Sequence, residues 1–133
     1  WDDLVKVLKQ ARGRVVVFLD ACHSGAAGTG LFATNDAAAQ DLLNEIPSGL
    51  LVFSASKGRQ LSEEVEQLGG GVFTNAVADV IARKRSAHDL DANGAIEASE
   101  LYTGVKRRVS ELTDGRQVPW LARNELVGDF ALF

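Results

Sequence analysis

The residues best suited to chemistry stand at the end of the segment Val15 to Gly25, which reads VVVFLDACHSG. Five apolar residues lead into a carboxylate, Asp20, and then into Cys22, the one cysteine of the 133-residue chain. A run without polar alternation predicts a strand that is covered on both faces, as in a parallel sheet. Sites in such sheets form beyond the carboxyl ends of the strands. Cys22 therefore stands where a nucleophilic thiol could meet a substrate.

A nucleophilic thiol needs a base, most often a histidine, to form the thiolate. The chain has two histidines. His23 adjoins Cys22, so on an extended segment its side chain points to the other side. His88 begins an acidic loop and is predicted to be a solvated surface residue. Neither is expected to be the base. The alternative for Cys22 itself is a buried, inert thiol.

A second group of candidate ligands lies between residues 88 and 100. This segment fits the pattern of an EF-hand calcium loop. The residues at loop positions 1, 3, 5, 6, 8 and 12 are, in order, Asp89, Asp91, Asn93, Gly94, Ile96 and Glu100. Four of these residues offer side-chain oxygens that would bind calcium: Asp89, Asp91, Asn93 and Glu100. The alternative is a surface turn in which Asp, Asn and Gly take their usual turn roles.

The apolar patterning predicts the elements that position these residues. Helices are expected at about residues 2–11, 36–46, 72–86 and 99–112, and buried strands at 15–19 and 49–56. Loops are expected at 25–35, 57–71 and 88–98, and short strands at VPWLA and DFALF near the end. The order strand, helix, strand predicts a parallel crossover unit. The expected fold class is α/β, a mainly parallel sheet flanked by helices, in one domain.

Composition and charge argue against several kinds of partner. The net charge is −4, whereas nucleic-acid binding requires a basic face. No apolar run reaches the roughly 20 residues of a membrane span, so no membrane partner is expected. One cysteine cannot form an internal disulfide, and one cysteine with two histidines does not suggest a zinc cluster. The single cysteine fits a reducing compartment, and we expect a cytoplasmic location.

The hexapeptide DACHSG after a buried strand resembles the nucleophile motif of the caspase, metacaspase and paracaspase superfamily of cysteine peptidases. Later segments resemble further elements of the family in the same order: LLVFSAS, GGGVFTNAVADVI, and DLDANGAIEASEL with the late GDFAL, the last two as in bacterial members. The resemblance covers most of residues 4–133. It implies a caspase-like fold, Cys22 as the nucleophile, a polypeptide substrate and no cofactor required for the chemistry.

The resemblance also implies a histidine outside this chain. The base of the family lies in a Ser-Gly-His-Gly-like segment, which in caspases stands about 50 residues before the cysteine. Here 21 residues precede Cys22, and no His-Gly pair occurs. We therefore expect residues 1–133 to be the C-terminal part of a larger catalytic domain, from the nucleophile strand to the C-terminal strand. A companion N-terminal fragment would supply the histidine. The alternative is a pseudo-peptidase that has lost it.

Two acidic positions bear on substrate preference. Asp20 stands two residues before Cys22, where metacaspases carry an Asp and accept Arg or Lys. Glu63 and Glu64 fall near the place where caspases carry an Arg that holds a substrate aspartate. The resemblance thus implies cleavage after Arg, with Lys second, and substrate contacts from Asp20 and Glu64, because a partly enclosed carboxylate suits a guanidinium. The alternatives are a strand-end carboxylate bonded to backbone amides and two solvated glutamates.

Two other functions remain open at this point. A catalytically inactive caspase-like interaction domain would lack a working pocket or a His-Gly segment. A calcium-responsive EF-hand-like module would show metal-dependent stability and no thiol reactivity. A cysteine-dependent phosphatase is disfavoured, because it requires Cys-x5-Arg and the corresponding residue here is Gly28.

Overall fold

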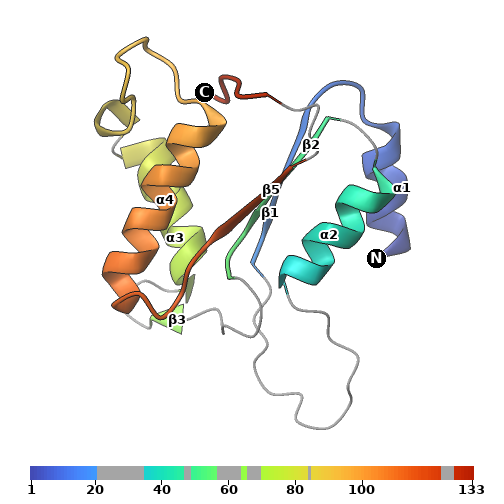
Figure 1. The fold of residues 1–133 in the computed structure, drawn as a ribbon, viewed down its shortest axis with the longest axis horizontal. Coiled ribbons are helices and arrows are strands. Elements are labelled where there is room, and N and C mark those ends of the chain that lie inside the picture. Colours follow the sequence, from blue (N-terminus) through green and yellow to red (C-terminus); the bar gives the residue numbers. More distant parts are fainter. Residues whose placement is uncertain (21–34, 47–48, 57–63, 66–69, 84, 124–127) are drawn as a thin grey trace, which may run out of the picture.

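The computed structural model of the chain places a central sheet between two pairs of helices (Figure 1). On one side lie α1 (Asp2–Gln10) and α2 (Asn35–Glu45), and on the other lie α3 (Val72–Ala78) and α4 (Ala98–Thr113). This arrangement confirms the α/β class. The structure describes residues 1–20, 35–46, 49–56, 64–65, 70–83, 85–123 and 128–133.

The sheet is built around β2 (Leu50–Ser54), which pairs with a strand on each side. β1 (Val15–Leu19) runs parallel to it, with Val17 opposite Val52, and β5 (Trp120–Arg123) runs antiparallel. The predicted strands 15–19 and 49–56 are confirmed. The segment VPWLA also contributes a strand, but with antiparallel pairing, so the described sheet is mixed.

The side chains of β2 form two cores, one on each face of the sheet. Leu51 and Phe53 pack with α3 and α4, whereas Leu50 and Val52 pack with α1, α2 and Ala122. Every residue of β2 is buried. Burial of each large apolar side chain contributes about 1.5–3 kcal/mol to folding. The uninterrupted apolar run therefore reflects a strand covered on both faces.

The segment predicted as one helix over 72–86 is three short pieces. α3 ends at Ala78, a π-helix follows at Asp79–Arg83, and a 3-10 turn at Arg85–Ala87. At the junction, the backbone N–H of Asp79 is shared between the carbonyls of Ala76 and Asn75, as is common at helix ends. The wider turn still buries Val80 in the core.

The segment predicted as a loop over 57–71 contains a small two-stranded ladder. β3 (Glu64–Val65) pairs antiparallel with β4 (Gly70–Gly71), so that Glu64 lies opposite Gly71. Strands of two residues are too short to show an alternating pattern, so no periodic signal predicts them.

The C-terminal segment DFALF does not form a full strand but pairs with the acidic loop. The N–H of Leu132 donates to the carbonyl of Ile96 at 2.8 Å, and the N–H of Ile96 donates to the carbonyl of Phe133 at 3.0 Å. Asp129 accepts hydrogen bonds from the backbone N–H and the hydroxyl of Ser99, in the first turn of α4. The end of the described chain thus fixes both the loop and the helix that follows it (Figure 1).

The structure corrects the prediction that His88 is a solvated surface residue. Its exposed fraction is 6%. A Cβ atom at Gly104 of α4 would lie 2.6 Å from Nδ1 of His88 and 3.0 Å from Cε1, so the ring packs directly against the bare helix backbone. Sequence spacing could not reveal this contact, because it joins the start of the loop to the middle of another element.

The contact predicts that Gly104→Ala destabilises the fold. Alanine has a better helix propensity than glycine by about 1 kcal/mol, but its methyl group would overlap the buried imidazole. We expect a net loss of about 1–3 kcal/mol in the free energy of unfolding, measured by urea denaturation. The control is Thr103→Ala, at the exposed neighbouring position, with a change within about 0.5 kcal/mol. Equal stability of Gly104→Ala and the wild type would contradict the close packing.

Candidate active site

β1 and β2 end side by side at one edge of the sheet. The ladder pairs Leu19 with Ser54, and beyond it the N–H of Ala55 donates to the carbonyl of Leu19 at 2.9 Å. Asp20 follows Leu19 directly, so it leaves the sheet at its carboxyl edge, where the sequence predicted a site. Cys22 and His23, which come next, lie outside the described residues, as does Glu63.

Asp20 is half-buried, and its two carboxylate oxygens have different surroundings. Thr74, in the first turn of α3, donates a hydrogen bond of 2.7 Å from its hydroxyl to Oδ2. Oδ1 is shielded from solvent, and it has no hydrogen-bond partner in the part of the chain that the structure describes. A shielded carboxylate oxygen without a donor is unfavourable. This oxygen is therefore an acceptor that a bound cationic group could satisfy.

Gly71 makes room for the same carboxylate. A Cβ atom at this position would lie 2.6 Å from Oδ2 of Asp20, so a larger residue would displace the carboxylate or the strand. Gly71 also pairs with Glu64 in the β3–β4 ladder. The ladder thus brings the backbone of Glu64, the second predicted substrate-binding residue, to the corner that contains Asp20.

Sequence reasoning missed the roles of Gly71 and Thr74. Both belong to the segment GGGVFTNAVADVI, whose resemblance to a family element does not indicate a contact with Asp20. Thr74 lies 54 residues beyond Asp20 in the chain. The motif was a signal that the segment matters, but only the fold could show what it touches.

A buried glutamine joins α4 to the same edge of the sheet. Gln117 is fully buried, and its side-chain Nε2 donates to the carbonyl of Ala55 at 2.8 Å. Its backbone N–H donates to the hydroxyl of Thr113, the last residue of α4. Ala55 is thus held from both sides, by Leu19 through its N–H and by Gln117 through its carbonyl. This residue too was missed, because a polar residue after a helix usually indicates a turn.

The acidic loop gathers three of the four predicted calcium ligands. Carboxylate oxygens of Asp89, Asp91 and Glu100 all lie within 4.8 Å of one another. Asn93, the fourth, donates from its side-chain amide to Asp91 at 3.0 Å and from its backbone to Asp89 at 3.0 Å. Carboxylate oxygens are the kind of ligand that a hard cation takes. Gly94 has a φ of +86°, as the sharp turn at this position requires.

Two glutamates of this loop share a hydrogen bond at the start of α4. Glu97 and Glu100 form a capping box. The pKa of Glu97 lies above its usual value: the Asn93 amide lowers it, but the hydrogen bond with Glu100, desolvation and the charge of Glu100 outweigh that effect. The pKa of Glu100 lies below its usual value. The hydrogen bond with Glu97 lowers it most, and bonds from the backbone N–H groups of Glu97, Leu90 and Asp91 lower it further, whereas desolvation raises it.

The acidic loop and the carboxyl edge of the sheet lie at opposite ends of the molecule. Figure 1 shows the start of α4 beside the C-terminus, and the far end of α4 near β3 and the end of β1. A cation in the loop would therefore take no direct part in chemistry beside Asp20.

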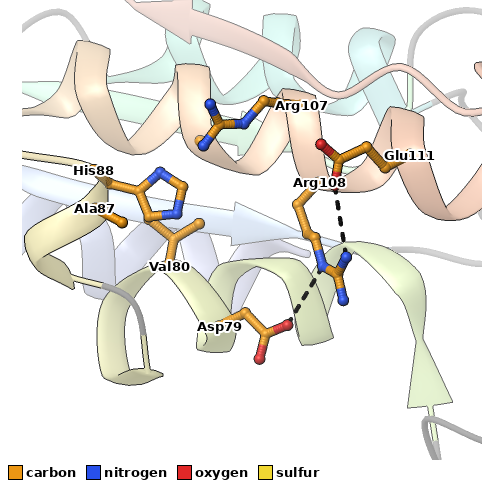
Figure 2. Close-up of a pocket in the computed structure, with 8 residues that line it drawn as sticks. Asp79, Val80, Ala87, His88, Arg107, Arg108 and Glu111 are labelled. Atoms are coloured by element: carbon orange, nitrogen blue, oxygen red, sulfur yellow. Dashed lines mark ion pairs between the residues drawn. The ribbon is translucent and has the colours of Figure 1, made fainter. Parts of the chain in front are cut away.

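A separate cavity of about 300 Å³ lies between α4 and the π-helical segment (Figure 2). Arg108 crosses it, with its Nε 3.5 Å from Asp79 Oδ2 and its Nη1 3.6 Å from Glu111 Oε2. The acidic partners balance the Arg108 charge. The described lining contains neither Asp20 nor a predicted ligand of the acidic loop.

The fold and this edge define an α/β domain with a candidate thiol site beyond the carboxyl ends of two parallel strands. The family model for the caspase domain matches residues 1–131, and the chain therefore belongs to the caspase-domain family. No curated protein and no solved structure matches the chain significantly. Among the described helices, none combines the length and the apolar character needed to cross a bilayer.

The hydrogen bond of Gln117 predicts that Gln117→Leu destabilises the domain. Leucine has a similar size, but it leaves the buried carbonyl of Ala55 without its donor. We expect a loss of about 1–3 kcal/mol in the free energy of unfolding, measured by urea denaturation. Gln10→Leu, at an exposed position of α1, is the matched control and should change stability by less than about 0.5 kcal/mol. A loss no larger than that of the control would show that the bond is dispensable.

Proposed function

We propose that this caspase-family domain is a cysteine endopeptidase that cleaves peptide bonds after Arg and, second, after Lys. The observation that carries the proposal is the place of Asp20. A carboxylate with an unsatisfied oxygen stands at the carboxyl edge of the sheet, two residues before the one cysteine. A guanidinium or ammonium group would supply the missing donor and the opposite charge.

In the proposed reaction, the thiolate of Cys22 attacks the carbonyl carbon of the scissile bond and forms a C–S bond. The electron pair moves to the carbonyl oxygen, which the backbone N–H of Cys22 stabilises. When the C–N bond breaks, a histidine protonates the leaving amine. Water then attacks the acyl-enzyme, the histidine accepts its proton, and rupture of the C–S bond releases the carboxylic acid product and restores the thiolate. The chemistry needs no cofactor.

The histidine belongs, in this proposal, to a companion N-terminal segment that pairs along the outer edge of β1. Within the described residues β1 has one neighbour, β2. It is an apolar strand, and Phe18 is 40% exposed although its ring stacks on that of Phe53. Apolar parallel strands are normally covered by neighbours on both sides. Leu4 and Val7 of α1 are also exposed apolar residues.

We predict that an arginine chloromethyl ketone alkylates Cys22 in the intact sample, as measured by peptide mass spectrometry. Asp20→Asn should slow this labelling at least about tenfold, because the pocket loses its charge, and should leave alkylation by iodoacetamide unchanged. The matched control is Asp2→Asn, on the exposed face of α1. The intact mass spectrum should also reveal a second polypeptide that contains a His-Gly segment.

Three results would count against this proposal. If an aspartyl chloromethyl ketone labelled Cys22 as fast as the arginine chloromethyl ketone does, this result would contradict the preference for basic residues. Alkylation of Cys22 by iodoacetamide alone would favour an inactive interaction domain. A working nucleophile without a second polypeptide would contradict the companion segment.

We propose a second function for the acidic loop, the binding of calcium. It is supported by the cluster of Asp89, Asp91 and Glu100 and by the pairing of Ile96 with the C-terminal segment. EF-hand loops usually occur in pairs, and here residues 131–133 offer the loop a strand-like partner. At the far end of the sheet, calcium would act on stability rather than on catalysis.

Calorimetric titration with calcium chloride should therefore show binding by the wild type and none by Asp89→Ala. Calcium should also raise the thermal midpoint of the wild type, and saturation at about 100 times the dissociation constant would add about 2.7 kcal/mol of stability. Asp2→Ala is the control for a lost surface carboxylate and should bind as the wild type does. Flat traces for all three proteins would remove the calcium proposal.

A further inference from the structure

We propose that Thr74 is a positioning residue that orients the carboxylate of Asp20 toward the cationic side chain of a substrate. The inference rests on the proposed cleavage after Arg. It assigns to the first turn of α3 a part in substrate selection, although this turn lies far from Asp20 and Cys22 in the sequence.

The contacts around Oδ2 fix the carboxylate from two directions. The hydroxyl of Thr74 donates to Oδ2 at 2.7 Å, and the backbone of Gly71 lies so close that a Cβ atom would be 2.6 Å from the same oxygen. A carboxylate that follows the last residue of a strand is otherwise free to rotate about its side-chain bonds. The hydroxyl of Thr74 and the backbone of Gly71 together restrict the carboxylate of Asp20 to one orientation.

Thr74 is well placed to hold this orientation, because its neighbours anchor it in the core. Val72 and Phe73 are 0% and 1% exposed and pack in the cluster with β2 and α4. Thr74 itself is exposed. Its hydroxyl therefore has a fixed position beside the carboxylate to which it donates.

The consequence concerns Oδ1, the other oxygen. With Oδ2 held by Thr74, Oδ1 is shielded and lacks a hydrogen-bond partner among the described residues. An arginine side chain would give Oδ1 both a donor and a positive charge, whereas its neutral isostere would give a donor without the charge. If the hydroxyl of Thr74 is removed, the carboxylate can turn, and the oxygen that faces the substrate is no longer determined.

The test compares binding of two peptide amides that end in arginine or in citrulline, its neutral isostere. Binding is measured by calorimetry in the Cys22→Ala background, where no turnover occurs. Thr74→Val should weaken binding of the arginine peptide about tenfold or more and leave that of the citrulline peptide within about threefold. Thr74→Ser, which keeps the hydroxyl, should bind both peptides as the Cys22→Ala protein does.

Two further variants complete the design. Asp20→Asn should abolish the preference for arginine. Thr103→Val removes an exposed hydroxyl from α4, on the same side of the sheet, and should change neither affinity. With Cys22 restored, Thr74→Val should raise KM for arginine substrates and leave kcat nearly unchanged, since the hydroxyl touches no reacting atom.

The outcomes separate this inference from the proposed function. If Thr74→Val loses the arginine preference but the wild type cleaves no peptide, the positioning role stands and the peptidase proposal fails. If Thr74→Val binds both peptides as its parent does, the positioning role is overturned, whatever the turnover. It is also overturned if the Cys22→Ala protein does not prefer arginine to citrulline, or if Thr74→Ser fails to keep the preference.

Discussion

The parallel backbone ladder between β1 and β2 is the interaction on which the rest of this domain depends. It joins the two apolar cores, because β2 gives alternate side chains to α1 and α2 on one face and to α3 and α4 on the other. It also continues one residue past the strands, where Ala55 donates to Leu19. That last bond fixes the point at which the chain leaves the sheet, and so it fixes the position of Asp20 and the direction in which the chain sets out toward Cys22.

α4 connects this edge to the opposite end of the molecule. Just beyond its C-terminal end, Gln117 holds the carbonyl of Ala55, and at its N-terminal end Ser99 is bonded to Asp129 in the C-terminal segment. The acidic loop lies between that segment and the buried His88. α4 therefore helps to hold both the acidic loop and the candidate active site in place. A cation bound in the loop would stabilise this helix without contact with the substrate.

The sequence predicted most of the helices and strands and the residues of the candidate site, but not the contacts that position those residues. The apolar runs 15–19 and 49–56 were sufficient for β1 and β2, although the predicted cover on both faces holds for β2 alone: β1 is partly exposed, with Phe18 at 40%. The helix predicted at 99–112 is the observed α4 to within one residue at each end. The pattern at 72–86 could not reveal the π-helical segment at Asp79–Arg83, because apolar spacing does not distinguish a single wider turn from an α-helical one. The burial of His88 depends on Gly104, and the orientation of Asp20 on Gly71 and Thr74, which are distant in the chain and carry no periodic signal.

The surroundings of Asp20 explain why such a carboxylate can discriminate between substrates. From the sequence alone, Asp20 could equally have been a strand-end carboxylate bonded to backbone amides. Its donor among the described residues is instead a side-chain hydroxyl, and there the second oxygen is shielded and has no partner. A buried acceptor without a donor costs about 1–3 kcal/mol. A cationic side chain would supply both a donor and the opposite charge, whereas a neutral one would supply no charge and an acidic one would add repulsion. Under the proposed function, selection for a basic residue would follow from the unpaired oxygen of Asp20 as much as from its charge.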